Sequence, residues 1–389
     1  MAAEAIFHDT VGVMAVITMV PVFFIWLERT TRWKIFDILP AILWIFITPV
    51  LLSYYGVIPH ESPVYTHFKA LAVPIFIVLM LLDIDIRRAV KVAWRGAGVL
   101  VLGSLGIVAG AVAAFALFRA ELPENTGLGF GALAGSWIGG TGNLAAVAEG
   151  LNTPSEMVGL VVLVDNFIYL LYFPIILTSK RWGGWFNRFS KVSNDQMQAI
   201  ADSVNAVERK THEVHFRDIL TLLGFGFTGI LIAQKLSELL PIIPPVMTGK
   251  TWAILLVTTI GIILSATPLK KVAGSEPVAM TFVYIYMTMI GAQADLGNIG
   301  GAVWFLVAGA FCIIIHFGFI LVGARIFRVD VSMAAVASVA AVGGAASAPV
   351  AAAYHREDLV PVSIMLALLG YGLGNYLGVA TGWFCQLIA

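Results

Sequence analysis

The chain has 389 residues, of which 59% are hydrophobic and 12% are charged, whereas a soluble globular domain has about 45–50% apolar and about 25% charged residues. The apolar residues come in blocks of about 17–25, each long enough to cross a hydrocarbon layer of about 30 Å as a helix. This composition excludes a water-soluble protein and predicts an all-α membrane protein. Lys plus Arg equal Asp plus Glu, at 23 each, so the net charge predicts no nucleic-acid or acidic partner.

Ten apolar blocks predict ten membrane-spanning helices. In chain order they are residues 11–27, 36–54, 68–82, 97–118, 157–178, 219–240, 251–269, 277–291, 301–322 and 360–384. The first block is expected to be a retained span, because no basic region or small-residue cleavage pattern marks it as a signal peptide. Cys312 and Cys385 lie inside apolar blocks, so we expect buried small residues rather than a disulfide or a metal site.

Two further stretches, 127–150 and 332–354, are rich in Gly, Ala and Ser and poor in Leu and Ile. Such composition is typical of close backbone packing or of interrupted helices. A polar segment with seven basic residues, 179–218, separates two halves. We therefore predict a first repeat over 1–178 with a hairpin at 127–150, a cytoplasmic linker over 179–218, and a second repeat over 219–389 with a hairpin at 332–354.

The two halves match each other at corresponding positions. Gly-Gly-Thr-Gly-Asn at 139–143 corresponds to Gly-Gly-Ala-Ala-Ser at 343–347, so a Gly-Gly pair is followed, three residues later, by a small polar residue. Further matches pair Asp85 with Asp295, Trp94 with Trp304, Glu156 with Asp358 and Tyr169 with Tyr371. Each match is weak alone, but their common order favours an internal repeat.

The positions of Lys and Arg choose between two topologies, because cytoplasmic loops are enriched in basic residues. If both Gly-rich stretches enter the membrane and return, and the N-terminus lies outside, 19 of the 23 basic residues are inside. Lys69, Arg119, Lys235 and Lys250 are then outside. If both stretches cross, about 10 are inside and about 13 outside. The re-entrant arrangement is favoured, and it makes the halves inverted repeats, as in secondary transporters. The alternative is a 12-span protein with parallel repeats and broken, crossing helices.

The tips of the two hairpins are predicted at their glycines. These are Gly139, Gly140 and Gly142 in the first hairpin, and Gly343 and Gly344 in the second. Glycine lets a ligand approach the backbone closely, and N–H groups at helix N-termini favour an anion such as a carboxylate. Nearby polar residues are candidate substrate ligands: Ser136, Thr141, Asn143, Ser347 and Asn375. The alternative is that these glycines only allow helices to pack closely.

Asp165 and Asn166 lie in the middle of the span 157–178. A carboxylate at that depth costs roughly 2.5–3.5 kcal/mol on insertion scales, so it is a functional candidate by default. We expect this pair to bind a coupling Na⁺ or to take a proton; the alternative is a carboxylate paired with a neighbouring helix. The matching span, 360–384, has no acidic residue, so the ion site would be asymmetric. His316 is also mid-span, and we expect it to be a hydrogen-bonded structural residue.

A family resemblance rests on two motifs. They are the run Gly-Ser-Trp-Ile-Gly-Gly-Thr-Gly-Asn at 135–143 and the pair Asp165-Asn166. Together they resemble the signature of the domain-of-unknown-function family 819 (YjcL-like) of multi-pass membrane proteins, over nearly the whole chain. The chain is distantly similar to cation/proton antiporter, bile-acid and 2-hydroxycarboxylate transporter families, and Gly-Gly-Thr-Gly resembles the Gly-Gly-x-Gly tips of the last group. Ala346 departs from that pattern in the second tip. The resemblance implies an elevator mechanism, with both hairpins moving against a dimerised scaffold.

These observations predict an ion-coupled secondary active transporter for a small carboxylate-bearing solute, such as an organic acid, an amino acid or a short peptide. We expect a multi-pass homodimer in the inner (cytoplasmic) cell membrane, in contact with lipid and solute, without a metal site, a nucleic-acid partner or any cofactor beyond coupling Na⁺ or H⁺. The alternative is a cation/proton antiporter without an organic substrate. An enzyme is not expected, because no nucleophile, base and orienting group form a recognisable set, and the repeat argues against a passive structural subunit.

Overall fold

The computed structural model describes residues 5–84, 86–193, 213–294 and 302–389. These residues are helical almost throughout, and among them the β-structure consists of an isolated bridge between Ile243 and Met247. Seven of the described helices are long and apolar enough to cross a membrane. The prediction of an all-α membrane protein is therefore confirmed. Asp85, Asp295 and residues 194–212 of the linker 179–218 lie outside the described residues.

The helices follow the predicted apolar blocks. The first half contains α1 (Thr10–Thr31), α2 (Ile35–Ile38), α3 (Ala41–Tyr54), α4 (Pro63–Leu82), α5 (Ile86–Phe118), α6 (Thr126–Gly150), α7 (Ser155–Thr178) and α8 (Gly183–Ser190). The second half contains α10 (Phe216–Ser237), α11 (Gly249–Ser265), α12 (Ser275–Gln293), α13 (Ala302–Phe327), α14 (Val331–Val342), α15 (Gly344–His355) and α16 (Val360–Leu387). Nine of the ten blocks coincide with one long helix each, and the block 36–54 is divided between α2 and α3. α5 begins well before its block, at Ile86, and has a kink at Ala93.

Local sequence signals set several helix starts. Asp9 precedes α1, and its carboxylate accepts hydrogen bonds from the backbone N–H groups of Val11 and Gly12. Asp330 caps α14 in the same way by accepting from the Met333 N–H. Such caps satisfy N–H groups that have no partner within the helix, so the chain enters the apolar layer with its backbone paired.

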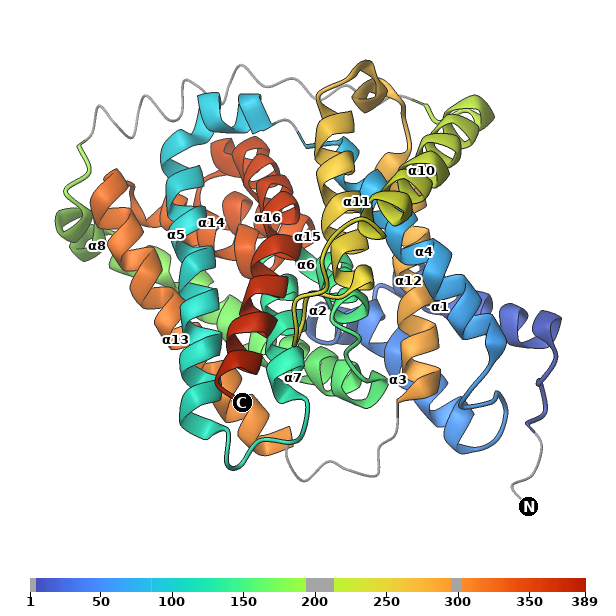
Figure 1. Cartoon of the computed structure of the whole chain (residues 1–389). Helices are drawn as coiled ribbons and strands as arrows, with labels where there is room; N and C mark the ends of the chain where they lie inside the picture. Colours follow the sequence, from blue (N-terminus) through green and yellow to red (C-terminus); the bar gives the residue numbers. More distant parts are fainter. Residues whose placement is uncertain (1–4, 85, 194–212, 295–301) are drawn as a thin grey trace.

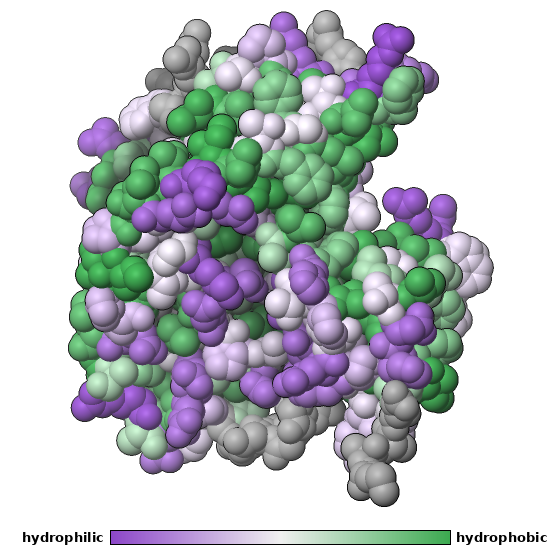
Figure 2. Space-filling model, turned by 45° about the vertical axis from the view of Figure 1, so that its right-hand side comes forward, coloured by the Kyte–Doolittle hydropathy of each residue, from purple (hydrophilic) through white to green (hydrophobic). Residues whose placement is uncertain are grey.

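Large apolar side chains are exposed along the outermost helices. On α1 the exposed fractions of Met19, Phe23 and Trp26 are 59%, 49% and 55%, and on α10 Leu231 is 58% exposed. Figure 2 shows broad apolar areas of this kind on one face of the molecule. A soluble monomer rarely exposes so much contiguous apolar surface, and a helix that faces lipid does so without penalty.

The helices form two groups that lie side by side in Figure 1. The first, which we call the panel group, contains α1, α3, α4, α10, α11 and α12. The second, the hairpin group, contains α5, α6, α7, α13, α14, α15 and α16. In the panel group α3 packs on α12, α11 packs on α4, and α4 packs on α12. In the hairpin group α5 packs on α13, and α6 packs on α16.

α6 folds back on itself at Gly140. A β-carbon added to Gly131 would lie 2.6 Å from Leu151, and one added to Gly135 would lie 2.9 Å from Val147 and 3.0 Å from the carbonyl oxygen of Asn143. In a continuous helix, which rises 1.5 Å per residue, such residues would be far apart. Thr126–Gly150 therefore has two limbs that lie side by side.

α14 and α15 form the second hairpin, which coincides with the predicted stretch 332–354. Asp330, just before α14, and Arg356, just after α15, approach within 3.5 Å, so the two ends of the segment meet. The turn lies between them at Gly343 and Gly344. Both Gly-rich stretches therefore share one design, which is two antiparallel limbs joined at a glycine pair.

The hairpins open at opposite ends of α7. The first ends at Gly150, close to where α7 begins at Ser155, whereas Lys180, just after α7, donates to the carbonyl of Tyr354 at the end of the second hairpin. α7 has 24 residues and is thus about 36 Å long. Because this length separates the two bases, the tips point toward each other from opposite sides of the molecule.

Two aromatic contacts relate α5 and α13 reciprocally. Trp94, just after the kink of α5, packs on Phe327 at the end of α13, with ring centroids 6.1 Å apart. Trp304 at the start of α13 packs on Phe118 at the end of α5, at 6.2 Å. Trp94 and Trp304 are a matched pair of the predicted repeat. The inverted repeat and the entry of the hairpins into a membrane stay predictions.

Candidate functional site

The tips of the two hairpins meet near the middle of the hairpin group. Gly140 has φ 78° and ψ −176°, and Gly344 has φ 62°. Residues with a side chain rarely adopt these conformations. A β-carbon added to Gly344 would lie 3.8 Å from the α-carbon of Gly140. The two breaks in the helices are therefore in contact, although they are 204 positions apart in the sequence.

Each break starts a new helical limb that points its N-terminus at the other tip. The second limb of the first hairpin starts after Gly140, and α15 starts at Gly344, where no side chain caps the helix. The first N–H groups of a helix have no partner within it, and the helix dipole makes this end positive. Two helix N-termini thus lie at the meeting point, an arrangement that suits an anion.

Two tyrosines flank the tips. The ring of Tyr371 on α16 would lie 3.4 Å from a β-carbon at Gly140 and 3.8 Å from one at Gly344. The hydroxyl of Tyr169 on α7 would lie 2.9 Å from a β-carbon at Gly343, where the Ser347 side chain is equally close at 2.8 Å. The Tyr169 hydroxyl is buried and has no hydrogen-bond partner among the described residues. Tyr169 and Tyr371 are also matched positions of the predicted repeat.

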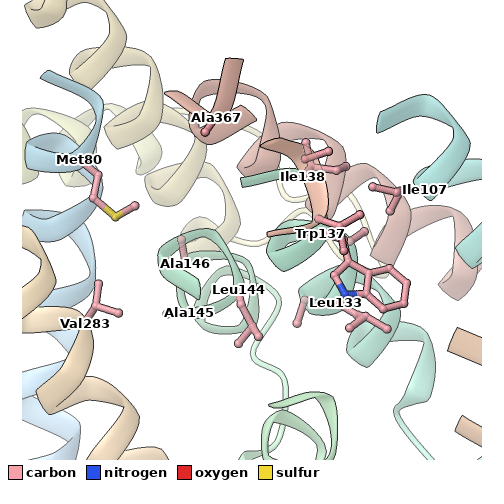
Figure 3. Close-up of a cluster of buried hydrophobic side chains, with 14 of the residues drawn as sticks. Met80, Ile107, Leu133, Trp137, Ile138, Leu144, Ala145, Ala146, Val283 and Ala367 are labelled. Atoms are coloured by element: carbon pink, nitrogen blue, oxygen red, sulfur yellow. The ribbon is translucent and has the colours of Figure 1, made fainter. Parts of the chain in front are cut away.

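Asp165 is held by two donors from the first hairpin. The Ser136 hydroxyl donates to Oδ2 at 2.7 Å, and the Trp137 indole Nε1–H donates to Oδ1 at 2.7 Å. Trp137 is fully buried, and Figure 3 shows its ring beside Leu133 in the apolar cluster around this limb. Because both oxygens are engaged by one hairpin limb, the carboxyl of α7 is rigidly placed next to the tip.

Asn143 joins the first hairpin to α16. Its amide nitrogen donates to the Tyr371 carbonyl and to Asn375 Oδ1, both at 2.9 Å, and Asn375 in turn donates to the Thr258 hydroxyl of α11 at 2.8 Å. Both asparagines are buried. A β-carbon at Gly374 would lie 2.6 Å from the Asn143 amide, so the side chain sits in a space that glycine leaves. These buried hydrogen bonds hold the second limb of the first hairpin between the two helix groups.

Asn166 lies away from the tips. Its amide donates to the Val162 carbonyl of its own helix. It also lines an apolar cavity of about 280 Å³ between α7, α13 and the region from Leu39 to Leu43. Neighbouring Asp165 and Asn166 therefore face different surroundings, and the structure does not bring them together around one ion.

His316 belongs to a buried hydrogen-bond chain. Its Nδ1 lies 2.9 Å from the Gly103 carbonyl, which can only accept, so Nδ1 carries a proton. Its Nε2 lies 2.8 Å from the Ser338 hydroxyl, and Ser338 lies 2.7 Å from the Tyr172 hydroxyl. In the neutral histidine, Ser338 therefore donates to Nε2 and accepts from Tyr172. The chain connects α5, α13, α14 and α7, as expected for a structural histidine.

The structure brings together most of the residues that the sequence singled out. Gly139, Gly140, Gly142, Gly343, Gly344, Thr141 and Ser347 are at or next to the tips, with Ser136, Asn143, Asp165 and Asn375 packed behind them. Sequence reasoning did not assign a role to Trp137, Tyr169, Tyr371 or Thr258. The repeat alignment already contained both tyrosines. Within the described ranges, no group of three or more His, Cys, Asp or Glu residues could hold a metal ion.

Comparison with known proteins gives two matches. The profile of the family "Protein of unknown function (DUF819)" matches residues 15–387. The chain is also 30% identical over 345 residues to "Uncharacterized membrane protein YjcL" of Bacillus subtilis (strain 168), an alignment that covers 86% of this chain and 87% of the relative. The match therefore includes both hairpins and α7.

Proposed function

The chain belongs to the DUF819 family of multi-pass membrane proteins, and we propose that it is an ion-coupled secondary active transporter for a small carboxylate-bearing solute. The observation that carries the proposal is the contact between Gly140 and Gly344. Two interrupted helices meet there with their N-terminal N–H groups unpaired by their own helices. Secondary transporters bind anionic groups of substrates at such half-helix ends.

The solute would lie between the two tips. Thr141 and the backbone N–H groups that follow it would hold the carboxylate from one side, and Ser347 with the N–H groups of α15 from the other. The buried Tyr169 hydroxyl, next to Gly343 and Ser347, would donate a further hydrogen bond. Asn143 and Asn375 would shape this pocket rather than line it, because their amides already bond within the protein.

The packing of the helices supports an elevator-type movement of the hairpin group against the panel group. The two hairpins open at opposite ends of α7, and the α3–α12 packing has a counterpart in α11–α4. The contacts of Trp94 and Trp304 are related in the same way, because each tryptophan packs on a phenylalanine of the other half of the chain. Inverted repeats of this kind allow a carrier to open alternately to either side. The proposal places a homodimer in the cytoplasmic membrane and requires no enzymatic step and no cofactor beyond the coupling ion.

One observation favours a second candidate function, a cation/proton antiporter without an organic substrate. Asp165 is a partly buried carboxyl group bonded to the first hairpin, and two amides that could bind a solute are already paired with each other. Such an antiporter would need Asp165 but not the polar side chain at Ser347. The two functions therefore differ in what Ser347 contributes.

The test is thermal unfolding of the purified protein with a panel of carboxylates, amino acids and short peptides, with and without Na⁺ and at several pH values. A ligand that binds only the folded protein stabilises it by about 2.7 kcal/mol at a hundredfold excess over Kd. Counterflow of each stabilising solute in reconstituted vesicles then measures transport. We expect a carboxylate to stabilise the wild type and to be transported.

Ser347→Ala should weaken this stabilisation by a carboxylate, whereas Ser363→Ala should not. Ser363 is a suitable control because it is buried in α16 and donates to the Val360 carbonyl of its own helix. Cation exchange that survives Ser347→Ala, with no solute stabilising any variant, would establish the antiporter instead.

A further inference from the structure

We propose that the coupling ion is a proton, carried on Oδ2 of Asp165, with the Ser136 hydroxyl as the partner that reorients when the proton arrives or leaves. This inference rests on the transporter function proposed above and names its ion. It follows from the kind of group that contacts each carboxyl oxygen, the charges on the surrounding helices, and the ligands that a metal cation would require.

The two contacts of Asp165 differ in what they can do. The Trp137 indole N–H can only donate, so Oδ1 is an acceptor in every state. The Ser136 hydroxyl can donate or accept. When Asp165 is ionised, Ser136 donates to Oδ2; when Oδ2 carries a proton, Oδ2–H donates to Ser136, and the Ser136 hydrogen turns to another acceptor. The step is a reversible protonation of a carboxylate, with the proton taken from water on one side and released on the other.

The two hairpins, as the structure describes them, provide no cation to neutralise Asp165. The first hairpin has no ionisable residue between Asn125 and Glu149, and the second has none between Asp330 and Tyr354. Tyr169, one turn along α7 from Asp165, is neutral when its hydroxyl is protonated. An ionised carboxylate in a membrane interior is costly unless it is paired, so binding a proton relieves a charge for which the described residues offer no opposite charge nearby.

The other ionisable groups on the helices packed against α7 are distant along the chain or at helix ends. The cationic ones are Lys180 and Arg181 beyond the end of α7, and Arg325 at the end of α13. The acidic ones are Glu149 at the end of α6, Glu156 at the start of α7 and Glu276 at the start of α12. Tyr172 and His316 make their contacts within their own buried chain. Buried His355, at the end of α15, lies 3.1 Å from the Ile176 carbonyl of α7. The tyrosines of α3, α12 and α15 complete the set among the described residues.

A metal cation would fit this site less well than a proton. Hard cations are bound by several oxygen atoms, whereas one of the two contacts here is an N–H group that cannot ligate a cation. Asn166, the neighbouring oxygen-bearing side chain, lines the apolar cavity instead. Ser136 alone would remain as a side-chain oxygen ligand from the first hairpin.

The test is infrared difference spectroscopy of the purified wild-type protein during a pH titration, because a protonated carboxyl has its own C=O stretching band. We expect a band that Asp165→Asn removes. Asp83→Asn is the matched control: Asp83 also accepts from a serine, Ser275, at 2.6 Å, but it follows α4 at a helix end. That variant should keep the Asp165 band.

Two variants separate a proton carrier from a merely structural carboxyl. Trp137→Phe removes the donor that stabilises the ionised form, so the midpoint of the band should move to higher pH by about one unit, a tenfold gain in proton affinity. Ser136→Ala should shift the band frequency, and Ser136→Thr should restore it. A missing band in the wild type, or a band unaffected by Asp165→Asn, overturns the inference.

Sodium gives the decisive comparison. Binding of radioactive Na⁺ should be the same in the wild type and in Asp165→Asn, and adding Na⁺ at fixed pH should leave the band unchanged. If Na⁺ removes the band and its binding is lost in Asp165→Asn, the site is a Na⁺ site and the proton inference is wrong. The proposed transporter function would survive that result if solute counterflow is observed. Conversely, a band that titrates in a protein that transports no solute would refute the transporter function and support the proton site.

Discussion

The α-carbon of Gly140 lies 3.8 Å from the position that a β-carbon would occupy at Gly344. Both residues have positive φ angles, and Gly140 adopts the extended form of this region that is essentially restricted to glycine. The contact joins two hairpins that enter from opposite ends of α7. It follows that the geometry of the proposed pocket depends on two residues that have no side chain.

Gly140→Ala should lower the free energy of unfolding by about 1–3 kcal/mol through backbone strain. Steric crowding adds little, because the nearest atom to the new β-carbon is Tyr371 Cε1 at 3.4 Å. Thermal unfolding in detergent measures the change. Gly224→Ala is the control: Gly224 lies in α10 with nothing within 4 Å of its β-position, and Ala there should stabilise by about 0.5–1 kcal/mol. Equal effects of both substitutions would contradict the strain argument.

The buried chain of His316, Ser338 and Tyr172 should behave as one unit. Ser338→Ala leaves both the histidine Nε2 and the tyrosine hydroxyl without their partner, so we expect a loss of about 1–3 kcal/mol in unfolding free energy. Ser104→Ala, at a buried serine that donates to the Leu100 carbonyl of its own helix, should cost less. Combining Ser338→Ala with Tyr172→Phe should give a non-additive effect, whereas strict additivity would argue against a shared network.

Arg356 and Asp358 give the base of the second hairpin a predictable pH dependence. The hydrogen bond from Arg356 holds the pKa of the Asp358 carboxyl below its ordinary value. A carboxyl whose pKa is lower in the folded state stabilises the protein at pH values above its unfolded-state pKa of about 3.9. This contribution is lost as the pH falls through the folded-state pKa. Asp358→Asn should therefore destabilise at neutral pH by less than about 1 kcal/mol, because the pair is partly exposed.

Unfolding midpoints across a pH series measure this dependence. The difference between Asp358→Asn and the wild type should shrink as the pH is lowered, and it should be absent for Glu357→Gln at the exposed neighbouring position. A difference that grows toward acid would reverse the assigned sign and contradict the assignment to Asp358.

Local sequence patterns were sufficient for the helical fold, and the tandem glycines coincide with the positions where the helices break. Apolar length predicts a span and tandem glycines predict a break, because both depend on a few neighbouring residues. The start of α5 was missed for the same reason: Arg87, Arg88, Lys91 and Arg95 interrupt its apolar pattern, although the helix begins at Ile86. Charged residues in the first turns of a helix lower the local hydropathy, so the apolar block begins later than the helix does.

The partners of the candidate site could not be predicted in this way. Trp137 and Asp165 are 28 positions apart, and Asn143 and Asn375 are 232 apart. Which residues meet depends on how the limbs of the first hairpin pack between the two helix groups. Figure 3 shows Ala146 of one limb on the side of Met80 and Val283 in the panel group, and Trp137 of the other limb on the side of Ile107 of α5. Helix periodicity alone does not set that orientation.

The outer end of the first hairpin is tied to the panel group by charge. Glu149 on α6 lies 3.5 Å from the Lys250 ammonium on α11, and Lys69 on α4, which donates to Gln293 at 2.7 Å, interacts electrostatically with the same carboxylate. The Thr251 hydroxyl adds a bond to the Gly150 carbonyl at 2.8 Å. If the hairpin group moves against the panel group, the ion pair between Glu149 and Lys250 must break in each cycle.

Glu149→Gln should therefore speed exchange of solute across reconstituted vesicles while changing the unfolding free energy by at most about 1 kcal/mol, since the Lys250 side chain is largely exposed and the pair is 3.5 Å apart. The difference from the wild type should fade at high ionic strength, because salt screens exposed charges. Glu238→Gln is the control: it removes an exposed ion pair with Lys235 within one segment of the panel group. If both variants change the exchange rate equally, or if the Glu149→Gln effect is independent of salt, the ion pair does not restrain the movement of the hairpin group.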